Sequence, residues 1–274
     1  MAEPTALSEA NSSTAGLAVR LRSVTKVYDN GVMALGPLDL DVGRGEFVSL
    51  LGPSGCGKST ALRLIAGLSA PTAGTVAVAR RTSEVSARHS IGFVFQEPTL
   101  MPWTSVRENV RLPLKLAHAP VAEANARVAE ALAQVALSEF ADAYPRELSG
   151  GMKMRVSLAR ALVTDPDILL MDEPFAALDE ITRFRLNNDL LSLWRNLRKT
   201  VIFVTHSVFE SVYLSQRVII MTSRPGRIGA EVRIDAPSRG TRIFEPPPNM
   251  PPTAGKSRTR WRRCTMGKLR HDFP

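Results

Sequence analysis

The sequence predicts an α/β fold built around a parallel sheet. Three apolar runs of strand length, residues 47–51, 168–172 and 201–205, are each followed by a glycine-rich or polar segment. Helical patterns lie between these runs, and strands that alternate with helices usually form a parallel sheet. With 44% hydrophobic and 22% charged residues, the chain also has the composition of a globular protein.

Length and composition exclude several classes of protein. A chain of 274 residues suffices for one large domain or two small ones. Its longest apolar runs, such as residues 218–221, are far shorter than the roughly 18 residues that a membrane span requires. Residues 1–16 have no basic cluster before an apolar run, so we expect no signal peptide. The two cysteines, Cys56 and Cys264, exclude a disulfide framework, and the chain is expected to be soluble and cytosolic.

The net charge of +9 is concentrated at the C-terminal end. Residues 237–274 contain nine basic and two acidic side chains, whereas the preceding 236 residues contain 26 basic and 24 acidic ones. A near-neutral body with a basic tail indicates an appended segment, not a basic groove across a fold. We therefore expect no nucleic acid among the partners.

A glycine-rich loop follows the first apolar run and precedes a helix that we predict over residues 61–67. It has the spacing G-x4-G-K-S, in which backbone N–H groups and the helix N-terminus point at phosphate oxygens. Lys58 is placed to reach the β- and γ-phosphates, and the Ser59 hydroxyl to ligate Mg²⁺. A glycine turn with a surface lysine is the alternative, but the flanking strand and helix favour nucleotide binding. The predicted nucleotide-binding residues are Gly52, Pro53, Ser54, Gly55, Cys56, Gly57, Lys58, Ser59 and Thr60.

Two carboxylates end the second apolar run, and a histidine follows the third. Asp172 can hold Mg²⁺ through water, and Glu173 is placed to orient or deprotonate the attacking water. His206 is a candidate γ-phosphate contact, because it lies at the mouth of the same parallel sheet. Neither the carboxylate pair nor the histidine indicates nucleotide chemistry by itself. They support it because the phosphate loop lies upstream in the same chain.

A third motif, Leu-Ser-Gly-Gly-Met at residues 148–152, precedes a helix predicted over residues 153–163. With this motif the sequence resembles the nucleotide-binding subunit of ABC transporters over residues 17–235. The family's motifs occur in order along the chain. They are matched by Tyr28 as the aromatic residue that stacks on adenine, residues 52–60 as the phosphate loop, Gln96 in the Q-loop, residues 148–152 as the signature, Asp172 and Glu173 as the Walker B pair, residues 177–179 as the D-loop, and His206 as the switch histidine.

The resemblance implies both a fold and a chemistry. The fold is a P-loop NTPase with a RecA-like core, an antiparallel β edge and a helical signature subdomain. The activity is hydrolysis of ATP, with ATP and Mg²⁺ as the bound groups. The implied catalytic residues are Glu173, His206 and Gln96. The implied Mg²⁺ ligands are Ser59, Gln96 and Asp172.

Partners follow from the same resemblance. ATP would lie between the phosphate loop of one chain and the signature of a second chain arranged head to tail. Residues 97–103 would dock on a transmembrane permease, and a periplasmic or lipoprotein solute-binding protein would deliver the solute. The chain would lie at the cytoplasmic face of the bacterial inner membrane. The nucleotide contacts implied outside the phosphate loop are Tyr28, Ser149, Gly150, Gly151 and Asp179.

One departure from the family pattern narrows the resemblance. The fifth signature position, usually glutamine, is Met152, which is familiar in importers of nitrate, sulfonates, taurine or pyrimidine precursors. Residues 175–183, 205–215 and 223–228 point to the same subgroup. None of these features names the solute, because the solute contacts lie in the permease and the binding protein.

Two alternative functions are weighed against this hypothesis. A soluble, non-transport ABC ATPase usually carries two cassettes or a long coiled-coil insertion, but Ser149 lies only 91 positions after Lys58. A module that binds nucleotide without hydrolysing it is opposed by Glu173, His206 and Gln96. An ATP-hydrolysing importer subunit is the leading hypothesis.

The chain divides into three predicted parts. Residues 1–16 are interpreted as a disordered leader, residues 17–236 as the nucleotide-binding domain and residues 237–274 as a disordered Pro-rich and basic tail. Within the domain, residues 97–165 are expected to form the helical subdomain, which includes an amphipathic helix at 121–135.

The tail has three interpretations. An anionic-lipid patch and a nucleic-acid arm are two of them. The one we favour is a change of reading frame near Pro237. Reverse translation of residues 238–250 with GC-rich codons gives a shifted frame that resembles the normal continuation of the importer subgroup. Resequencing the gene across codons 235–245 tests this, since an intact frame would exclude it.

Overall fold

The structure is a computed structural model that describes residues 16–79 and 91–234. The predicted tail lies outside these residues, and so does the predicted leader except for its last residue. Among the described residues, no helix is long and apolar enough to span a bilayer.

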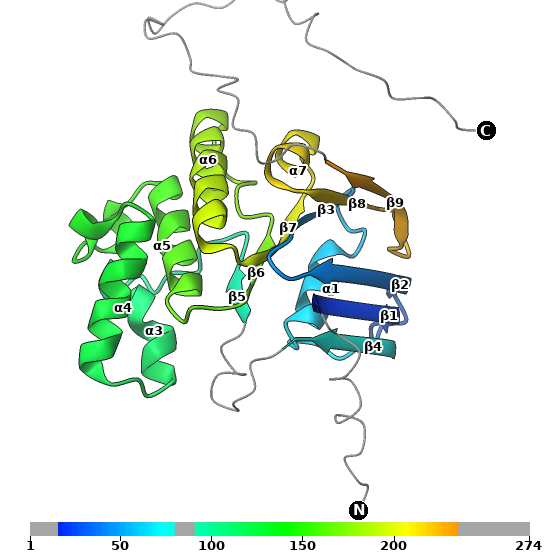
Figure 1. Ribbon diagram of the computed structural model, residues 1–274, viewed down its shortest axis with the longest axis horizontal. Coiled ribbons are helices and arrows are strands. Elements are labelled where there is room, and N and C mark those ends of the chain that lie inside the picture. Colours follow the sequence, from blue (N-terminus) through cyan, green and yellow to red (C-terminus); the bar gives the residue numbers. More distant parts are fainter. Residues whose placement is uncertain (1–15, 80–90, 235–274) are drawn as a thin grey trace, which may run out of the picture. The chain divides into compact units, whose positions relative to one another are not determined.

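A six-stranded sheet organises the described part (Figure 1). Its strand order is β5-β6-β7-β3-β8-β9, and all neighbours are parallel except β8 and β9. The strands are β3 (Phe47–Leu51), β5 (Ile91–Val94), β6 (Ile168–Asp172), β7 (Thr200–Thr205), β8 (Arg217–Met221) and β9 (Ile228–Arg233). The predicted α/β fold with a parallel sheet is confirmed.

The antiparallel part of the fold is a separate three-stranded sheet. It contains β1 (Leu17–Val27), β2 (Met33–Gly43) and β4 (Ala73–Val78), in the order β2-β1-β4. Helix α1 (Lys58–Ile65) contacts both sheets, through β2 and β4 on one side and β6 and β7 on the other.

The remaining α-helices of the described part fall into two groups. The first lies between β5 and β6 in the sequence and contains α3 (Val106–Leu116), α4 (Val121–Gln134) and α5 (Gly150–Leu162), with α3 packed on both others. The second contains α6 (Glu180–Leu197) and α7 (Val208–Leu214), which follow β6 and β7. The helix predicted over residues 121–135 is confirmed as α4.

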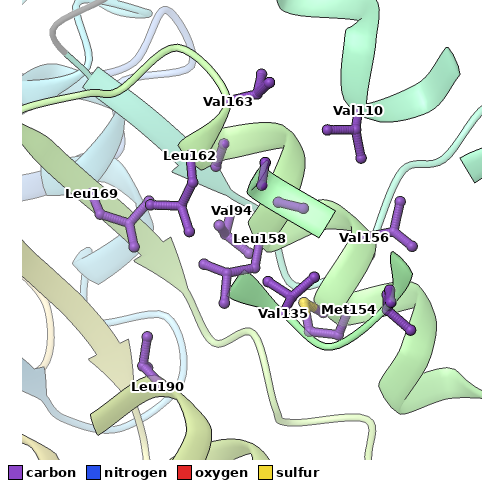
Figure 2. Close-up of a cluster of buried hydrophobic side chains, with 14 of the residues drawn as sticks. Val94, Val110, Val135, Met154, Val156, Leu158, Leu162, Val163, Leu169 and Leu190 are labelled. Carbon is purple, nitrogen blue, oxygen red and sulfur yellow. The ribbon is translucent and has the colours of Figure 1, made fainter. Parts of the chain in front are cut away.

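The central strands are buried on both faces, which is why they read as unbroken apolar runs. Successive side chains of a strand point to opposite faces. On β7, Phe203 packs with the helical side of the core, whereas Ile202 and Val204 pack with α1 and the three-stranded sheet. Figure 2 shows the helical side, where Leu158 and Leu162 of α5 lie near Leu169 of β6.

Two helices begin earlier than the sequence predicts. The first, predicted from residue 61, begins at Lys58, because Gly57 adopts φ 97° and turns the phosphate loop directly into α1. The second, predicted from residue 153, begins at Gly150, because the Ser149 side chain caps it by accepting a hydrogen bond from Met152 N. In both motifs, residues that the sequence places in a loop therefore form the first turn of the helix that follows.

Candidate nucleotide-binding site

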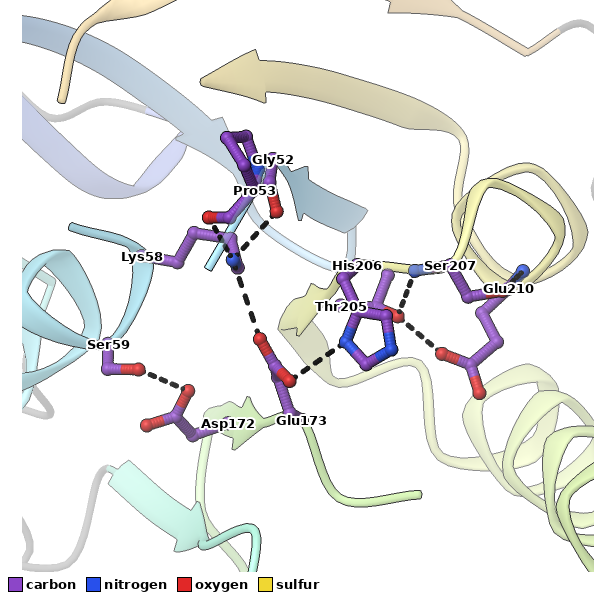
Figure 3. A network of polar contacts seen from close by, with 10 residues as sticks. All are labelled: Gly52, Pro53, Lys58, Ser59, Asp172, Glu173, Thr205, His206, Ser207 and Glu210. Carbon is purple, nitrogen blue, oxygen red and sulfur yellow. Dashed lines mark hydrogen bonds and ion pairs between the residues drawn. The ribbon is translucent and has the colours of Figure 1, made fainter. Parts of the chain in front are cut away.

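The candidate site lies at the carboxyl ends of three neighbouring parallel strands. In the strand register, Leu51 at the end of β3 pairs with Thr205 of β7, and Asp172 at the end of β6 pairs with Val204. The segments that follow these strands carry the phosphate loop, Glu173 and His206. Ligands of open α/β sheets bind at this edge, and Figure 3 shows the polar side chains that meet there.

The phosphate loop depends on glycines at positions where a side chain would be strained or blocked. Gly55 and Gly57 have φ values of 76° and 97°. A Cβ atom on Gly57 would lie 2.6 Å from Leu35 Cδ2 and 2.7 Å from the Ala34 carbonyl oxygen. Cys56 between them is completely buried, and a Cβ atom on Gly52 would lie 2.9 Å from its Sγ atom. At position 57, the backbone of the predicted phosphate-binding loop therefore accommodates only glycine.

Lys58 is almost entirely buried beneath this loop. Its ammonium group donates to the carbonyl oxygens of Gly52 at 2.8 Å and Pro53 at 3.0 Å. It also lies 3.4 Å from Glu173 Oε1. A buried ammonium requires such partners, and here they hold the positive charge between the phosphate loop and the proposed catalytic carboxylate.

Ser59 and Asp172 form the second polar contact of the site. The Ser59 hydroxyl donates to Asp172 Oδ1 at 2.8 Å. Burial raises the pKa of Asp172, and the negative charge of nearby Glu173 acts in the same direction. No cluster of three or more His, Cys, Asp or Glu side chains among the described residues could hold a metal ion by itself. A hydroxyl and a carboxylate are nevertheless the oxygen ligands that Mg²⁺ takes beside substrate phosphates, so these two residues fit the predicted ion.

We expect Asp172→Asn to raise the free energy of unfolding of the nucleotide-free protein at about pH 8, by about 1 kcal/mol or less because solvent screens this partly exposed carboxylate. The folded-state pKa of Asp172 lies above its unfolded value, so its contribution to stability is complete at low pH. That contribution is lost as the pH rises through the folded-state pKa. Urea unfolding without Mg²⁺ should therefore show a larger gain at about pH 8 than at about pH 4.5.

The matched control is Asp142→Asn, because Asp142 is exposed and forms its ion pair with Arg107 at the surface. This change should give no gain at either pH. If Asp172→Asn destabilised the protein at about pH 8, or stabilised it equally at both values, burial of the charge would not be the cause.

Glu173 is held in place by its backbone and by a histidine. It has φ 46°, which is uncommon for a residue with a side chain, and its N–H donates to the Val204 carbonyl oxygen at 3.0 Å. Its Oε2 lies 2.9 Å from His206 Nδ1, and its Oε1 faces Lys58 (Figure 3). The structure therefore places the carboxylate between the predicted phosphate-binding lysine and the predicted switch histidine.

Comparison with known proteins identifies the family. Residues 35–176 match the model of a family described as ABC transporter, which is more than half of the chain. The chain belongs to the ABC transporter family. The resemblance carried by the sequence motifs is confirmed, and the chain is an ABC-type ATPase.

Relatives within the ABC transporter family match most of the chain. An uncharacterized ABC transporter ATP-binding protein of Methanocaldococcus jannaschii is 48% identical over 79% of this chain and 82% of its own. The nitrate import ATP-binding protein NrtD of Synechocystis sp. is 46% identical over 75% and 77%. The taurine import ATP-binding protein TauB of Jannaschia sp. is 43% identical over 82% and 84%. The resemblance to the nitrate, sulfonate and taurine subgroup is thus confirmed at the level of relatives.

Among solved structures of the ABC transporter family, a dimeric ATP-binding cassette in a post-hydrolysis state, bound to ADP and Pi, is similar to this chain. It is 36% identical, with a TM-score of 0.69, over 80% of this chain and 99% of that one. The P-loop NTPase fold predicted from the motifs is confirmed by this likeness.

The predicted signature and D-loop residues of this ABC cassette lie apart from the cluster in Figure 3. Ser149 and Asp179 cap α5 and α6, with the Asp179 carboxylate accepting from Thr182 N at 2.9 Å, a bond that lowers the pKa of Asp179. None of the described contacts that join Lys58, Glu173 and His206 reaches either cap. The signature and the D-loop instead approach each other, since a Cβ on Gly150 would lie 3.3 Å from Leu178.

Two further predicted residues lie beside the phosphate loop or the sheet. Tyr28 is 38% exposed, and its hydroxyl lies 3.1 Å from Thr60 Oγ1, so the predicted adenine contact borders the phosphate loop. Gln96 is exposed just after β5, the strand next to β6. Its predicted catalytic role and its predicted contact with Mg²⁺ stay predictions.

Sequence reasoning missed two residues that support these loops. Gly226 lies directly beneath the phosphate loop, where a side chain would collide with the Cys56 carbonyl group, and its N–H donates to Ala34 O at 3.1 Å. Arg160 of α5 donates to the carbonyl oxygens of Pro98 and Thr99, at 2.8 and 2.9 Å, and so ties the signature helix to the segment after Gln96. In the sequence, residues 223–228 indicate only the importer subgroup, and no pattern predicts a contact between residues 160 and 98.

Proposed function

We propose that this ABC ATPase is the ATP-hydrolysing subunit that powers a bacterial importer from the cytoplasmic face of the inner membrane. One observation carries the hydrolytic part of this proposal. Glu173 lies between Lys58 and His206 at the mouth of the phosphate loop, with a carboxylate oxygen toward each. A general base has to be within reach of both the phosphate and the water, and this position suits that role.

Phosphate binding would begin at the loop. The backbone N–H groups of the loop and the N-terminus of α1 attract phosphate oxygens, and Lys58 adds a full positive charge. In the nucleotide-free chain, that charge is shared with Glu173 across 3.4 Å. A γ-phosphate would compete with the carboxylate for the ammonium, leaving Glu173 free to accept a proton from water.

His206 would complete the environment of the γ-phosphate. Its Nδ1 is engaged by Glu173 Oε2, which leaves Nε2 for the substrate. As an imidazolium, the ring can donate from Nδ1 to the carboxylate and from Nε2 to a phosphate oxygen at the same time. The histidine would then stabilise negative charge on the phosphate and orient the general base.

Ser59 and Asp172 would hold Mg²⁺, with Gln96 as the third proposed ligand. An ion held by these residues would supply positive charge against the phosphates of ATP. The hydrogen bond between Ser59 and Asp172 holds the two proposed oxygen ligands side by side.

A second copy of the chain would supply the other half of the site. Ser149, Gly150 and Gly151 lie at the N-terminus of α5, which favours an anion, and the similar cassette bound to ADP and Pi is dimeric. We propose a head-to-tail dimer in which these residues and Asp179 close on the ATP of the partner. The permease would contact the exposed segment after Gln96, where Trp103 is 74% exposed.

The proposed solute is nitrate, a sulfonate such as taurine, or a related small solute such as a pyrimidine precursor, delivered by a solute-binding protein. Relatives named for nitrate and taurine import support this range. A thermal-melt screen of the solute-binding protein encoded beside this gene, with nitrate, taurine, alkanesulfonates and pyrimidines, tests it. A shift with one class is expected. The absence of such a protein, or of any shift, would remove the subgroup assignment.

A further inference from the structure

Two buried polar side chains lie behind His206 and have no role in the chemistry proposed above. Thr205, the last residue of β7, is 2% exposed, and Glu210, in the first turn of α7, is 5% exposed. The Thr205 hydroxyl is hydrogen-bonded to Glu210 Oε2. A buried carboxylate costs free energy unless it is paired, so a buried glutamate such as Glu210 usually has a specific role.

The contacts of these two residues enclose the turn that carries His206. Ser207 N donates to Thr205 Oγ1 at 3.0 Å, and Glu210 N donates to Ser207 Oγ at 3.3 Å. With the bond between Thr205 and Glu210, the three residues form a closed ring of hydrogen bonds, part of which is visible in Figure 3. His206 lies between Thr205 and Ser207 in the chain, so its backbone is fixed on both sides.

The ring is attached to the part of the sheet that holds the site. Thr205 pairs with Leu51, the residue before the phosphate loop. The neighbouring residue Val204 accepts the hydrogen bond from Glu173 N. The turn is therefore fixed relative to both the loop and the carboxylate, and from it the half-exposed His206 ring reaches Glu173 Oε2 at 2.9 Å.

We propose that Thr205 and Glu210 are positioning residues, which act through His206 by holding its turn at the distance that the contact with Glu173 requires. The inference rests on the role proposed for His206 in hydrolysis. The alternative is a purely structural role, in which Thr205 and Glu210 form hydrogen bonds with each other in the core. The rate of ATP hydrolysis would then not depend on them.

The decisive variant is Thr205→Val, which keeps the shape of the side chain and removes the hydroxyl. Ser207 N and the Glu210 carboxylate then lose their shared partner. Thr205→Ser restores the hydroxyl and is the conservative variant. The matched control is Thr200→Val, because Thr200 is 3% exposed at the opposite end of the same strand, and its hydroxyl oxygen accepts from Gly45 N at 2.9 Å.

We expect Thr205→Val to lower kcat for ATP hydrolysis by about 10-fold or more, since small displacements of catalytic groups are costly. KM for ATP should stay within about twofold, because the phosphate loop and Lys58, which provide most of the proposed ATP contacts, are unchanged. Thr205→Ser should restore kcat. Thr200→Val should lower the Tm without lowering kcat at a temperature where the protein is folded.

A second readout does not depend on activity. The chain has four histidines, so the ring nitrogens of His206 can be assigned by NMR with ¹⁵N-histidine and the His206→Ala variant. In the nucleotide-free protein, Thr205→Val should shift the His206 ring signals, and Thr200→Val should not. If Thr205→Val fails to fold, Glu210→Ala replaces it, because it removes the acceptor of the Thr205 hydroxyl without leaving a buried charge.

Three outcomes separate the inference from the proposed function. The first outcome is a folded Thr205→Val or Glu210→Ala variant with normal kcat and unshifted His206 signals, while His206→Ala is inactive. It overturns the positioning role alone. An equal loss of kcat in Thr200→Val also overturns it, since the effect would be one of general stability. Full activity in His206→Ala would instead refute the role proposed for His206, and with it the premise.

Discussion

Glu173→Gln should lower steady-state phosphate release by about 10²–10⁴-fold, the usual contribution of a general base, while ATP still binds. Glutamine keeps the length of the side chain and can still bond to His206, but it cannot accept a proton from water. It also removes the negative charge that lies 3.4 Å from Lys58. The lysine then has no carboxylate that competes with phosphate, so ATP affinity should be maintained or increased.

The measurement is phosphate release under saturating ATP and Mg²⁺, with binding followed separately by a fluorescent ATP analogue. Glu139→Gln is the matched control, because Glu139 is exposed in the short 3-10 helix Ser138–Phe140, and it should leave both quantities unchanged. Unchanged hydrolysis in Glu173→Gln would refute the role of general base. Loss of ATP binding would show that the carboxylate instead stabilises the loop.

Ser149→Asp should weaken ATP-driven association of two chains by roughly 10³-fold. Aspartate caps a helix about as well as serine, so α5 and the stability of the chain should be preserved. The added carboxylate would face the γ-phosphate of the partner's ATP, and two like charges about 4 Å apart repel by about 4 kcal/mol near a protein surface. Binding of ATP to a single chain should stay unchanged, because the phosphate loop is intact.

Ser105→Asp is the control for this change. Ser105 caps α3 in the same way, with its side chain accepting from Glu108 N, but it has no proposed nucleotide contact. Association measured against ATP concentration should be normal in this variant. Equal weakening in both variants would point to altered helix caps, and normal association in Ser149→Asp would exclude the signature from the site.

The sequence predicts local features of the fold well, because each has a local cause. The strand at residues 47–51 is observed with those bounds, and α4 ends within one residue of its prediction. Apolar runs bounded by glycine and an alanine-rich amphipathic pattern are enough for this. The first helix starts three residues early, because the φ of 97° at Gly57 is part of the phosphate-loop turn and leaves no mark in helix periodicity.

The site is predictable in its members but not in its internal contacts. The motifs identify Lys58, Glu173 and His206, yet the two contacts that join them depend on the register of β3, β6 and β7. The positive φ of Glu173 and the position of Gly226 beneath the phosphate loop also arise from packing between distant segments. Sequence patterns describe neighbours along the chain, and these contacts form between elements that the sequence separates widely.

The central claim is that two chains of this ABC ATPase enclose ATP and hydrolyse it in a composite site. Sedimentation velocity of Glu173→Gln, with and without ATP and Mg²⁺, tests it most directly, because a hydrolysis-deficient chain should accumulate in the closed state. We expect a monomer without nucleotide, a dimer with ATP, and a monomer again when Ser149→Asp is added. A chain that binds ATP and stays monomeric throughout would place the whole site in one subunit and contradict the account.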